Sequence, residues 1–154
     1  MPGVRFFIDT NILLYSHDGR NAEKAAEAKL WLRELAGRQI AVVNLQVLNE
    51  FTYVLLRKKW LDTPQQVFST AADFAELGDS PLTRREAILA RRLHLTFRYS
   101  WWDCLLLASA VELGCTHFLS EDLQDGQCVE DSGGKSLTIL SPFAHSPERI
   151  LDLR

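Results

Sequence analysis

Acidic residues recur in this chain at positions where a folded domain can use them for chemistry. Asp9 follows the apolar run Phe6–Ile8, and Asp122 comes shortly after a second run, His117–Leu119. Both runs are typical of short strands buried in a parallel sheet. In open α/β sheets ligands bind beyond the carboxyl ends of the strands, so a carboxylate at either place is positioned for chemistry.

These two acids also have purely structural explanations. Asp9 is followed by Thr10 and Asn11, and all three residue types are good N-caps for a helix. Asp122 lies in a segment rich in Glu, Asp, Gln and Gly, which is a composition typical of turns. The sequence leaves both explanations open, and the deciding question is whether other acids converge on the same place.

Two further acids lie on predicted helices. Glu50 lies at the edge of the apolar stripe of a helix expected over 45–59, where most carboxylates are simply solvated. Asp103 is in line with the buried face of a helix expected over 100–114. A buried ionised carboxylate needs a partner, so we expect something cationic to meet Asp103. Alternatively, Ser100 and Asp103 have the spacing of a capping box.

Carboxylates gathered in one pocket repel each other and raise one another's pKa unless a divalent cation is present. Oxygen ligands without a cluster of Cys or His favour Mg²⁺ or Mn²⁺ over Zn²⁺. No metal-binding spacing occurs among the four histidines, His17, His94, His117 and His145. The chain also lacks a motif for covalent catalysis and a glycine-rich phosphate loop. The acids therefore predict a site for a hard divalent cation.

The remaining pattern predicts one α/β domain over residues 1–154, with strands and helices in alternation. Strands are expected at 6–8, 40–43, 117–119 and 137–140. Helices are expected at 12–16, from Asn21 to Leu35, at 45–59, from Thr63 to Leu77, after the capping box at 83–86, and at 100–114. The polar segment 125–135 is expected to be a loop, and a short amphipathic tail follows 141–143.

Composition sets limits on the class of protein. A net charge of −3 excludes a surface that is cationic throughout, although arginines at 84, 85, 91, 92 and 98 could form either a phosphate-binding strip or a solvated helix face. Three cysteines without a CxxC pair favour a reducing cytoplasm. No apolar run is long enough to cross a bilayer, and no signal pattern is present, so we expect a cytoplasmic protein without a membrane partner.

The motifs, taken in order, resemble the PIN-domain nuclease family, and within it the VapC-like ribonuclease toxins of prokaryotic toxin–antitoxin pairs. The resemblance covers nearly the whole chain. It rests on Phe7-Ile8-Asp9-Thr10-Asn11, Asn49-Glu50, Trp102-Asp103, the segment 118–126 and Leu140-Ser141-Pro142-Phe143.

This resemblance implies a single-domain, three-layer Rossmann-like PIN fold with a mainly parallel sheet of about five strands flanked by helices. It also implies a pocket that holds one or two Mg²⁺ or Mn²⁺ ions and activates water to hydrolyse RNA phosphodiester bonds. The implied ligands are Asp9, Glu50, Asp103 and Asp122, with Asp125 as a possible fifth. Residues implied to orient these ligands are Thr10, Asn11 and Ser120. A homodimer and an antitoxin that covers the pocket are implied as well.

Two other classes of protein remain open at this point. A haloacid dehalogenase-like phosphatase would use Asp9 as a nucleophile, but such enzymes need an acid two residues later, where this chain has Asn11. A catalytically inactive binding module would use the acids only for folding and regulation.

Overall fold

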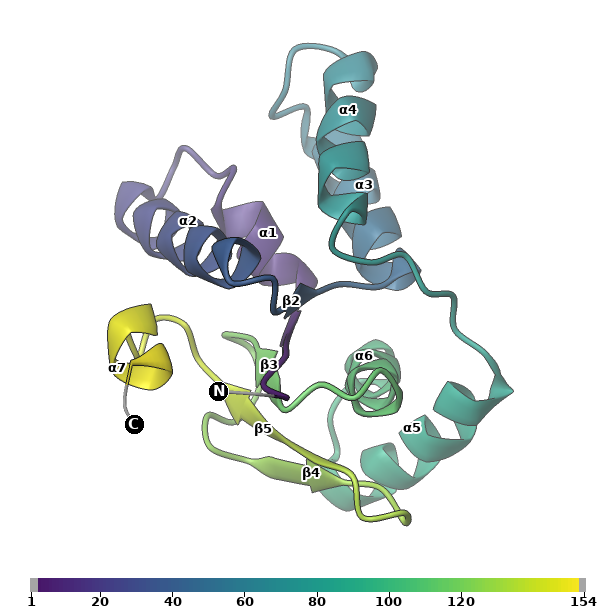
Figure 1. Cartoon of the computed structure of the whole chain (residues 1–154). Coiled ribbons are helices and arrows are strands. Elements are labelled where there is room, and N and C mark those ends of the chain that lie inside the picture. Colours follow the sequence, from purple (N-terminus) through teal and green to yellow (C-terminus); the bar gives the residue numbers. More distant parts are fainter. Residues whose placement is uncertain (1–2, 153–154) are drawn as a thin grey trace.

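A five-stranded sheet forms the centre of the computed structural model, which describes residues 3–152 (Figure 1). Its strands lie in the order β2-β1-β3-β5-β4. Their bounds are Phe6–Ile8 (β1), Ala41–Val42 (β2), His117–Leu119 (β3), Cys128–Glu130 (β4) and Ser136–Leu140 (β5). All neighbouring strands are parallel except β4, which runs antiparallel to β5. The expected mainly parallel α/β sheet is therefore confirmed.

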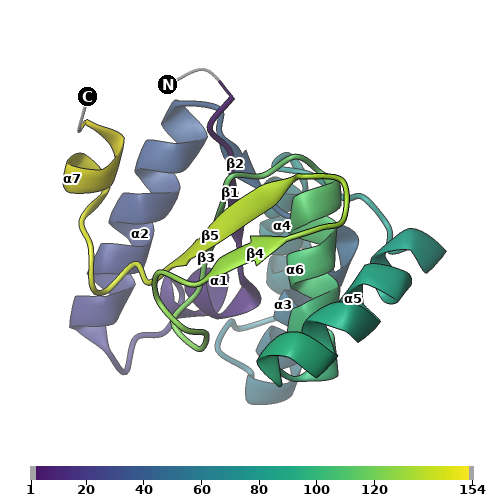
Figure 2. The same cartoon turned by 90° about the horizontal axis from the view of Figure 1, so that it is seen from below.

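Helices cover both faces of this sheet. Figure 2 shows α2 and α7 on one side of the strands and α5 and α6 on the other, which gives three layers. The helices are α1 (Thr10–Tyr15), α2 (Ala22–Gly37), α3 (Leu45–Lys58), α4 (Pro64–Ala75), α5 (Arg84–Phe97), α6 (Trp101–Glu112) and α7 (Pro147–Leu151). Within residues 3–152 no helix is both long and apolar enough to span a membrane.

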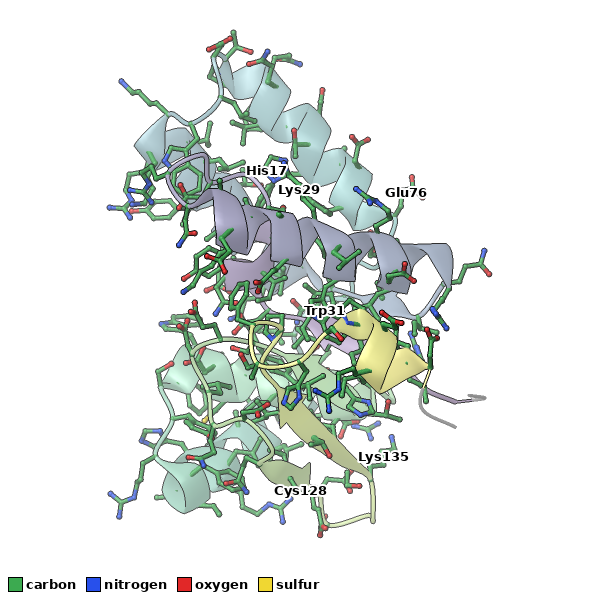
Figure 3. The ribbon with its side chains drawn as sticks, turned by 90° about the vertical axis from the view of Figure 1, so that its left-hand side faces the viewer. His17, Lys29, Trp31, Glu76, Cys128 and Lys135 are labelled. Carbon is green, nitrogen blue, oxygen red and sulfur yellow. The ribbon has the colours of Figure 1, made fainter. Side chains whose placement is uncertain are left out.

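The core follows from the apolar runs in the sequence. Every residue of β1 is fully buried, and α6 is buried from Cys104 to Val111, so this helix lies between the sheet and α5. On the other face Trp31 anchors α2, because its indole N–H donates to the carbonyl oxygens of Pro142 (2.9 Å) and His145 (3.2 Å). Figure 3 shows Trp31 beside the C-terminal segment that leads into α7.

Local capping signals fix the helix starts. The Thr63 and Thr83 side chains each form a complete capping box, as the sequence predicts for Thr83. Asn44 is fully buried, caps α3 by accepting from the Val47 N–H, and donates to the Ser109 hydroxyl of α6. This residue therefore links the end of β2 to two helices.

Three expectations about the elements are corrected. The segment 125–135 is not only a loop, because it contains β4, in which Val129 is fully buried between exposed neighbours. The strand expected at 40–43 is reduced to the two residues of β2. The first helix begins at Thr10 rather than at residue 12, since Asp9 already caps it. In each case tertiary pairing or capping, rather than apolar periodicity, sets the boundary.

Candidate active site

Asp9 lies at the carboxyl end of β1 and is almost completely buried. Its carboxylate accepts hydrogen bonds from the Thr10 N–H (2.7 Å) and from the Ser120 hydroxyl (2.7 Å). Burial raises the pKa of Asp9 to about 7, and the negative charges of Asp103 and Glu50 contribute to this rise. Asp9 is therefore the N-cap of α1, as one explanation of the sequence predicts, and also a buried acid with other carboxylates nearby.

Ser120 connects Asp9 to Asp122. The β1 and β3 strands pair in parallel with Ile8 opposite Leu119, so the residues that follow each strand are neighbours. The Ser120 hydroxyl donates to Asp9 and accepts from the backbone N–H of Asp122 at 3.2 Å. The Asn11 side chain donates to the Asp122 carboxylate at 2.8 Å. Ser120 and Asn11 thus lie where they can orient the two acids.

Glu50 reaches the same place from α3. The Thr10 hydroxyl donates to the Glu50 carboxylate at 3.1 Å, and the Gln46 amide donates to the same oxygen at 3.3 Å. Burial raises the pKa of Glu50, and the charge of Asp103 adds to the shift. Glu50 is therefore not a solvated edge residue of its helix.

Asp103 lies in the first turn of α6 and is half-buried. Burial raises its pKa, and the charge of Asp122 contributes. The Ser100 hydroxyl accepts from the Asp103 N–H at 3.2 Å, which is one half of a capping box, and the reciprocal bond is absent from the described residues. The ion pairs found in residues 3–152 do not include Asp103, so no described Lys or Arg side chain supplies the expected cationic partner.

The charges connect these four acids into one group. Each carboxylate with a raised pKa is affected by at least one of the others, in the pairs Asp9–Asp103, Asp9–Glu50, Glu50–Asp103 and Asp103–Asp122. Shifts in the same direction at neighbouring acids indicate a pocket with an excess of negative charge.

Asp125 lies apart from this group. Its carboxylate accepts from the Ser141 N–H (2.8 Å) and from His145 Nε2 (2.9 Å). Burial alone would raise the pKa of Asp125, but these hydrogen bonds outweigh burial and lower it. The structure therefore connects Asp125 to the C-terminal segment and does not bring it together with the other acids.

The donor atoms suit a hard divalent cation, although the site is not preformed. Within residues 3–152 no group of three or more His, Cys, Asp or Glu side chains is already close enough to hold a metal ion. Yet all the side-chain donors are oxygens, and two buried oxygens, Asn11 Oδ1 and Gln46 Oε1, have no hydrogen-bond partner in the described residues. Buried oxygens are rarely left unpaired. Because these ions prefer carboxylate oxygens as ligands, the four acids fit Mg²⁺ or Mn²⁺ in kind.

Two contacts near the acids were not predicted from the sequence. Gln46 lies one helical turn before Glu50, and this (i, i+4) spacing could have indicated the contact between them. Gln46 also donates to the Trp102 carbonyl oxygen at 3.3 Å. Lys24 of α2 forms an ion pair with Glu121, beside Asp122. No sequence signal indicates this second contact, because the two residues are far apart along the chain.

Solved structures with a similar fold include two complexes. One is VapBC2 of Rickettsia felis bound to a DNA fragment from the promoter. The matched chain of that structure is 14% identical to this chain, with a TM-score of 0.61, and the match covers 90% of this chain and 98% of the matched chain. This chain is 17% identical to a toxin–antitoxin complex from Klebsiella pneumoniae, with a TM-score of 0.59 over 88% of this chain and 96% of that chain. At such identities the likeness establishes the fold.

A third similar structure is VapC20 of Mycobacterium tuberculosis, described as a Sarcin-Ricin loop cleaving toxin. It is 18% identical, with a TM-score of 0.56 over 73% of this chain and 86% of that chain. Comparison with curated proteins gives no match. The family model of the PIN domain matches residues 6–124, from the start of β1 past Asp122. Because this match includes most of the chain and all four grouped acids, the protein belongs to the PIN domain family.

Proposed function

We propose that this protein is a metal-dependent endoribonuclease and the toxin of a toxin–antitoxin pair. The observation that carries the proposal is the group Asp9, Glu50, Asp103 and Asp122, whose charges and burial raise the pKa of three of its members at the carboxyl edge of the sheet. Membership of the PIN domain family and the structural similarity to VapC20, an RNA-cleaving toxin, support RNA as the substrate.

The four acids would hold one or two Mg²⁺ or Mn²⁺ ions. When bound, such an ion supplies a more acidic water and positive charge that balances the charge developing on the phosphate. The protein's own contribution is orientation. Ser120 holds the Asp9 carboxylate, Asn11 holds Asp122, and Thr10 holds Glu50, so that each acid keeps a lone pair for the ion.

We propose that an antitoxin covers the site of Asp9, Glu50, Asp103 and Asp122, here called the acid pocket, and also contacts α2. A cavity of about 750 Å³ lies along α2 and is lined by His17, Lys29 and Arg33 together with apolar residues that include Ala25 and Leu30. Figure 3 labels His17 and Lys29 on this side of the molecule. Cations around an apolar surface suit an amphipathic segment with acidic residues.

We also propose a homodimer that works in the cytoplasm. Large apolar side chains remain exposed on α3, α5 and α6, and they are Leu45, Tyr53, Leu56, Ile88, Leu95, Trp101 and Trp102. Exposed apolar residues in such number are typical of a surface that is covered in an assembly. The three free cysteines suit a reducing compartment.

Cleavage of RNA by the partner-free protein tests the proposed activity. With Mn²⁺ present, Asp9→Asn and Asp103→Asn should each lower the cleavage rate about 100-fold or more, because losing a ligand weakens the metal site. Asp73→Asn, at an exposed position of α4, is the matched control and should cleave at the parent rate. Undiminished cleavage by the two site variants would refute the assignment.

Two further measurements on the same protein separate the two other classes, the phosphatase and the inactive binding module. A phosphatase would form a covalent aspartyl-phosphate on Asp9, which mass spectrometry of the acid-quenched protein would detect. A binding module would retain Mn²⁺ affinity but cleave no RNA in partner-free form. Either result would replace the nuclease proposal.

A further inference from the structure

A cavity of about 250 Å³ opens beside Asp122, one of the four acids. Its lining includes Asp122 and Asn11, whose side chain donates to the Asp122 carboxylate. The rest of its lining comes from α1, the α1–α2 connection and the α3–α4 connection, and consists of Leu14, Tyr15, Asp18, Arg20 and Trp60. A molecule that contacts Asp122 is therefore next to this cavity.

Arg20 is held in a fixed orientation within the cavity. Its guanidinium donates to both carboxylate oxygens of Asp18, at 2.9 and 3.0 Å. These hydrogen bonds lower the pKa of Asp18 to about 2, so the carboxylate remains charged. The Arg20 side chain is nevertheless 69% exposed. A guanidinium has five N–H donors, and the bidentate pair uses two of them, so the others remain available to an incoming anion.

Trp60 forms an aromatic wall next to this cation. Lys59 ends α3 in the left-handed conformation, with φ of 55°, and the chain turns so that Trp60 lies beside the cavity. The Arg20 guanidinium lies 5.1 Å from the centre of the Trp60 ring, and the Lys58 ammonium lies 5.7 Å from it. Two cations and one indole ring are thus gathered next to a group of carboxylates.

This combination suits one kind of ligand. RNA carries a negative charge at every phosphate, and it must approach a pocket that is itself negatively charged, so cations at the margin are needed to bind it. An indole ring can stack against a base only if that base is unpaired. Phosphate contacts and base stacking together are the means by which proteins bind single-stranded nucleic acids.

We propose that the cavity lined by Arg20 and Trp60, with Lys58 beside the Trp60 ring, binds the nucleotide adjacent to the cleaved phosphodiester in single-stranded RNA. Arg20 and Lys58 contact its phosphate, and Trp60 packs against its base. The proposal rests on the ribonuclease function and adds a substrate requirement to it, namely an unpaired nucleotide on the Asp122 side of the acids.

Binding measurements test this cavity separately from catalysis. The probe is a short fluorescent single-stranded RNA, and its anisotropy is measured with the cleavage-deficient Asp9→Asn protein at several salt concentrations. Adding Trp60→Leu should weaken binding about tenfold, the contribution of roughly one stacked base, while leaving the salt dependence unchanged. Adding Arg20→Gln or Lys58→Gln should lower the slope of log affinity against log salt by about 0.7 each, the value for one phosphate contact.

Matched controls separate the cavity from general effects of charge, aromaticity and folding. Lys135→Gln removes an exposed cation from the β4–β5 connection, and Phe68→Leu removes an exposed aromatic ring from α4. Both should bind RNA like the parent. Trp60→Phe should restore most of the affinity lost in Trp60→Leu, and thermal melting of each variant establishes that it is folded.

The outcomes distinguish this inference from the proposed function. Affinities and salt slopes that match the parent in all three cavity variants would overturn the cavity assignment, even if the native protein cleaves RNA. The assignment would also be overturned if the three cavity variants bound RNA like the parent but lost affinity for an acidic protein partner. If the protein with Asp9 intact cleaves no RNA, the nuclease proposal fails, and the binding measurements alone decide whether the cavity holds RNA.

Discussion

Asp9 combines a structural role with a chemical one. As the N-cap of α1 it accepts a backbone hydrogen bond, which stabilises the helix. As a buried carboxylate near Asp103 and Glu50 it is destabilised whenever it is ionised, and this conflict raises its pKa to about 7. A neutral side chain of the same shape would keep the cap and remove the conflict.

Asp9→Asn should therefore stabilise the metal-free protein at high pH. Because the folded-state pKa of Asp9 lies above its unfolded value of 3.8, its contribution to stability is present below pH 3.8 and is lost as pH rises through about 7. In EDTA at pH 8 the melting temperature of Asp9→Asn should exceed that of the native protein by about 4 °C or more. The difference should shrink at pH 5, and a difference independent of pH would contradict the cause given for the pKa.

At the level of elements, the site depends on how β1, β3, α3 and α6 meet. Asp9 and Asp122 were predicted because each comes shortly after an apolar run, and the parallel pairing of β1 with β3 does bring them close. Periodicity placed Asp103 on the buried face of its helix, but it identified neither Asp103 nor Glu50 as a member of the site. An acid at the edge or on the buried face of a helix looks the same in sequence whatever it contacts, so only the order of the motifs indicated the site.

Strand β4 and one ion pair were missed by the sequence patterns because both depend on contacts between distant parts of the chain. Strand β4 contains one buried residue, Val129, in a polar segment, and its pairing with β5 depends on contacts that the local sequence does not encode. The ion pair between Lys24 and Glu121 likewise joins residues from different elements. Local patterns predicted the buried strands and the helix caps, while long-range pairing determined the rest.

Gly78 lies in the connection between α4 and α5, where the backbone passes close to Val43, the residue after β2. It adopts φ of +138°, and a Cβ atom placed there would lie 2.5 Å from the carbonyl oxygen of Val43. Gly78→Ala should lower the melting temperature by about 4 °C or more, as expected for strained backbone in a domain of this size. Gly37→Ala is the matched control, since nothing lies within 4 Å of its Cβ position at the end of α2, and it should melt no lower than the parent.

At the scale of the whole molecule, the exposed apolar surface is the feature on which the proposed dimer rests. Leu45, Tyr53 and Trp102 line a cavity of about 760 Å³ that also contains Glu50. A partner chain that covered this surface would bury apolar area and enclose one side of the acid pocket. The proposed dimer therefore brings two acid pockets close to a common interface.

Light scattering with size-exclusion chromatography tests this assembly. The native protein should elute with twice the mass of one 17.5 kDa chain. Tyr53→Glu should shift it to a single chain, because Tyr53 is 64% exposed on the apolar surface and a charge there cannot be buried without a partner. Phe68→Glu, at an exposed aromatic on α4, should leave the mass unchanged, and a native protein with the mass of one chain would contradict the dimer.

The pairing of β1 with β3 also determines when during synthesis the acid pocket can form. A nascent chain made only as far as α6 contains Asp9, Glu50 and Asp103, but it has neither β3 nor the Ser120 hydroxyl that joins Asp9 to Asp122. Such a chain also lacks the strand that must lie between β1 and β5 to complete the sheet. Fragments released before residue 122 is made therefore lack one of the four acids of the proposed site.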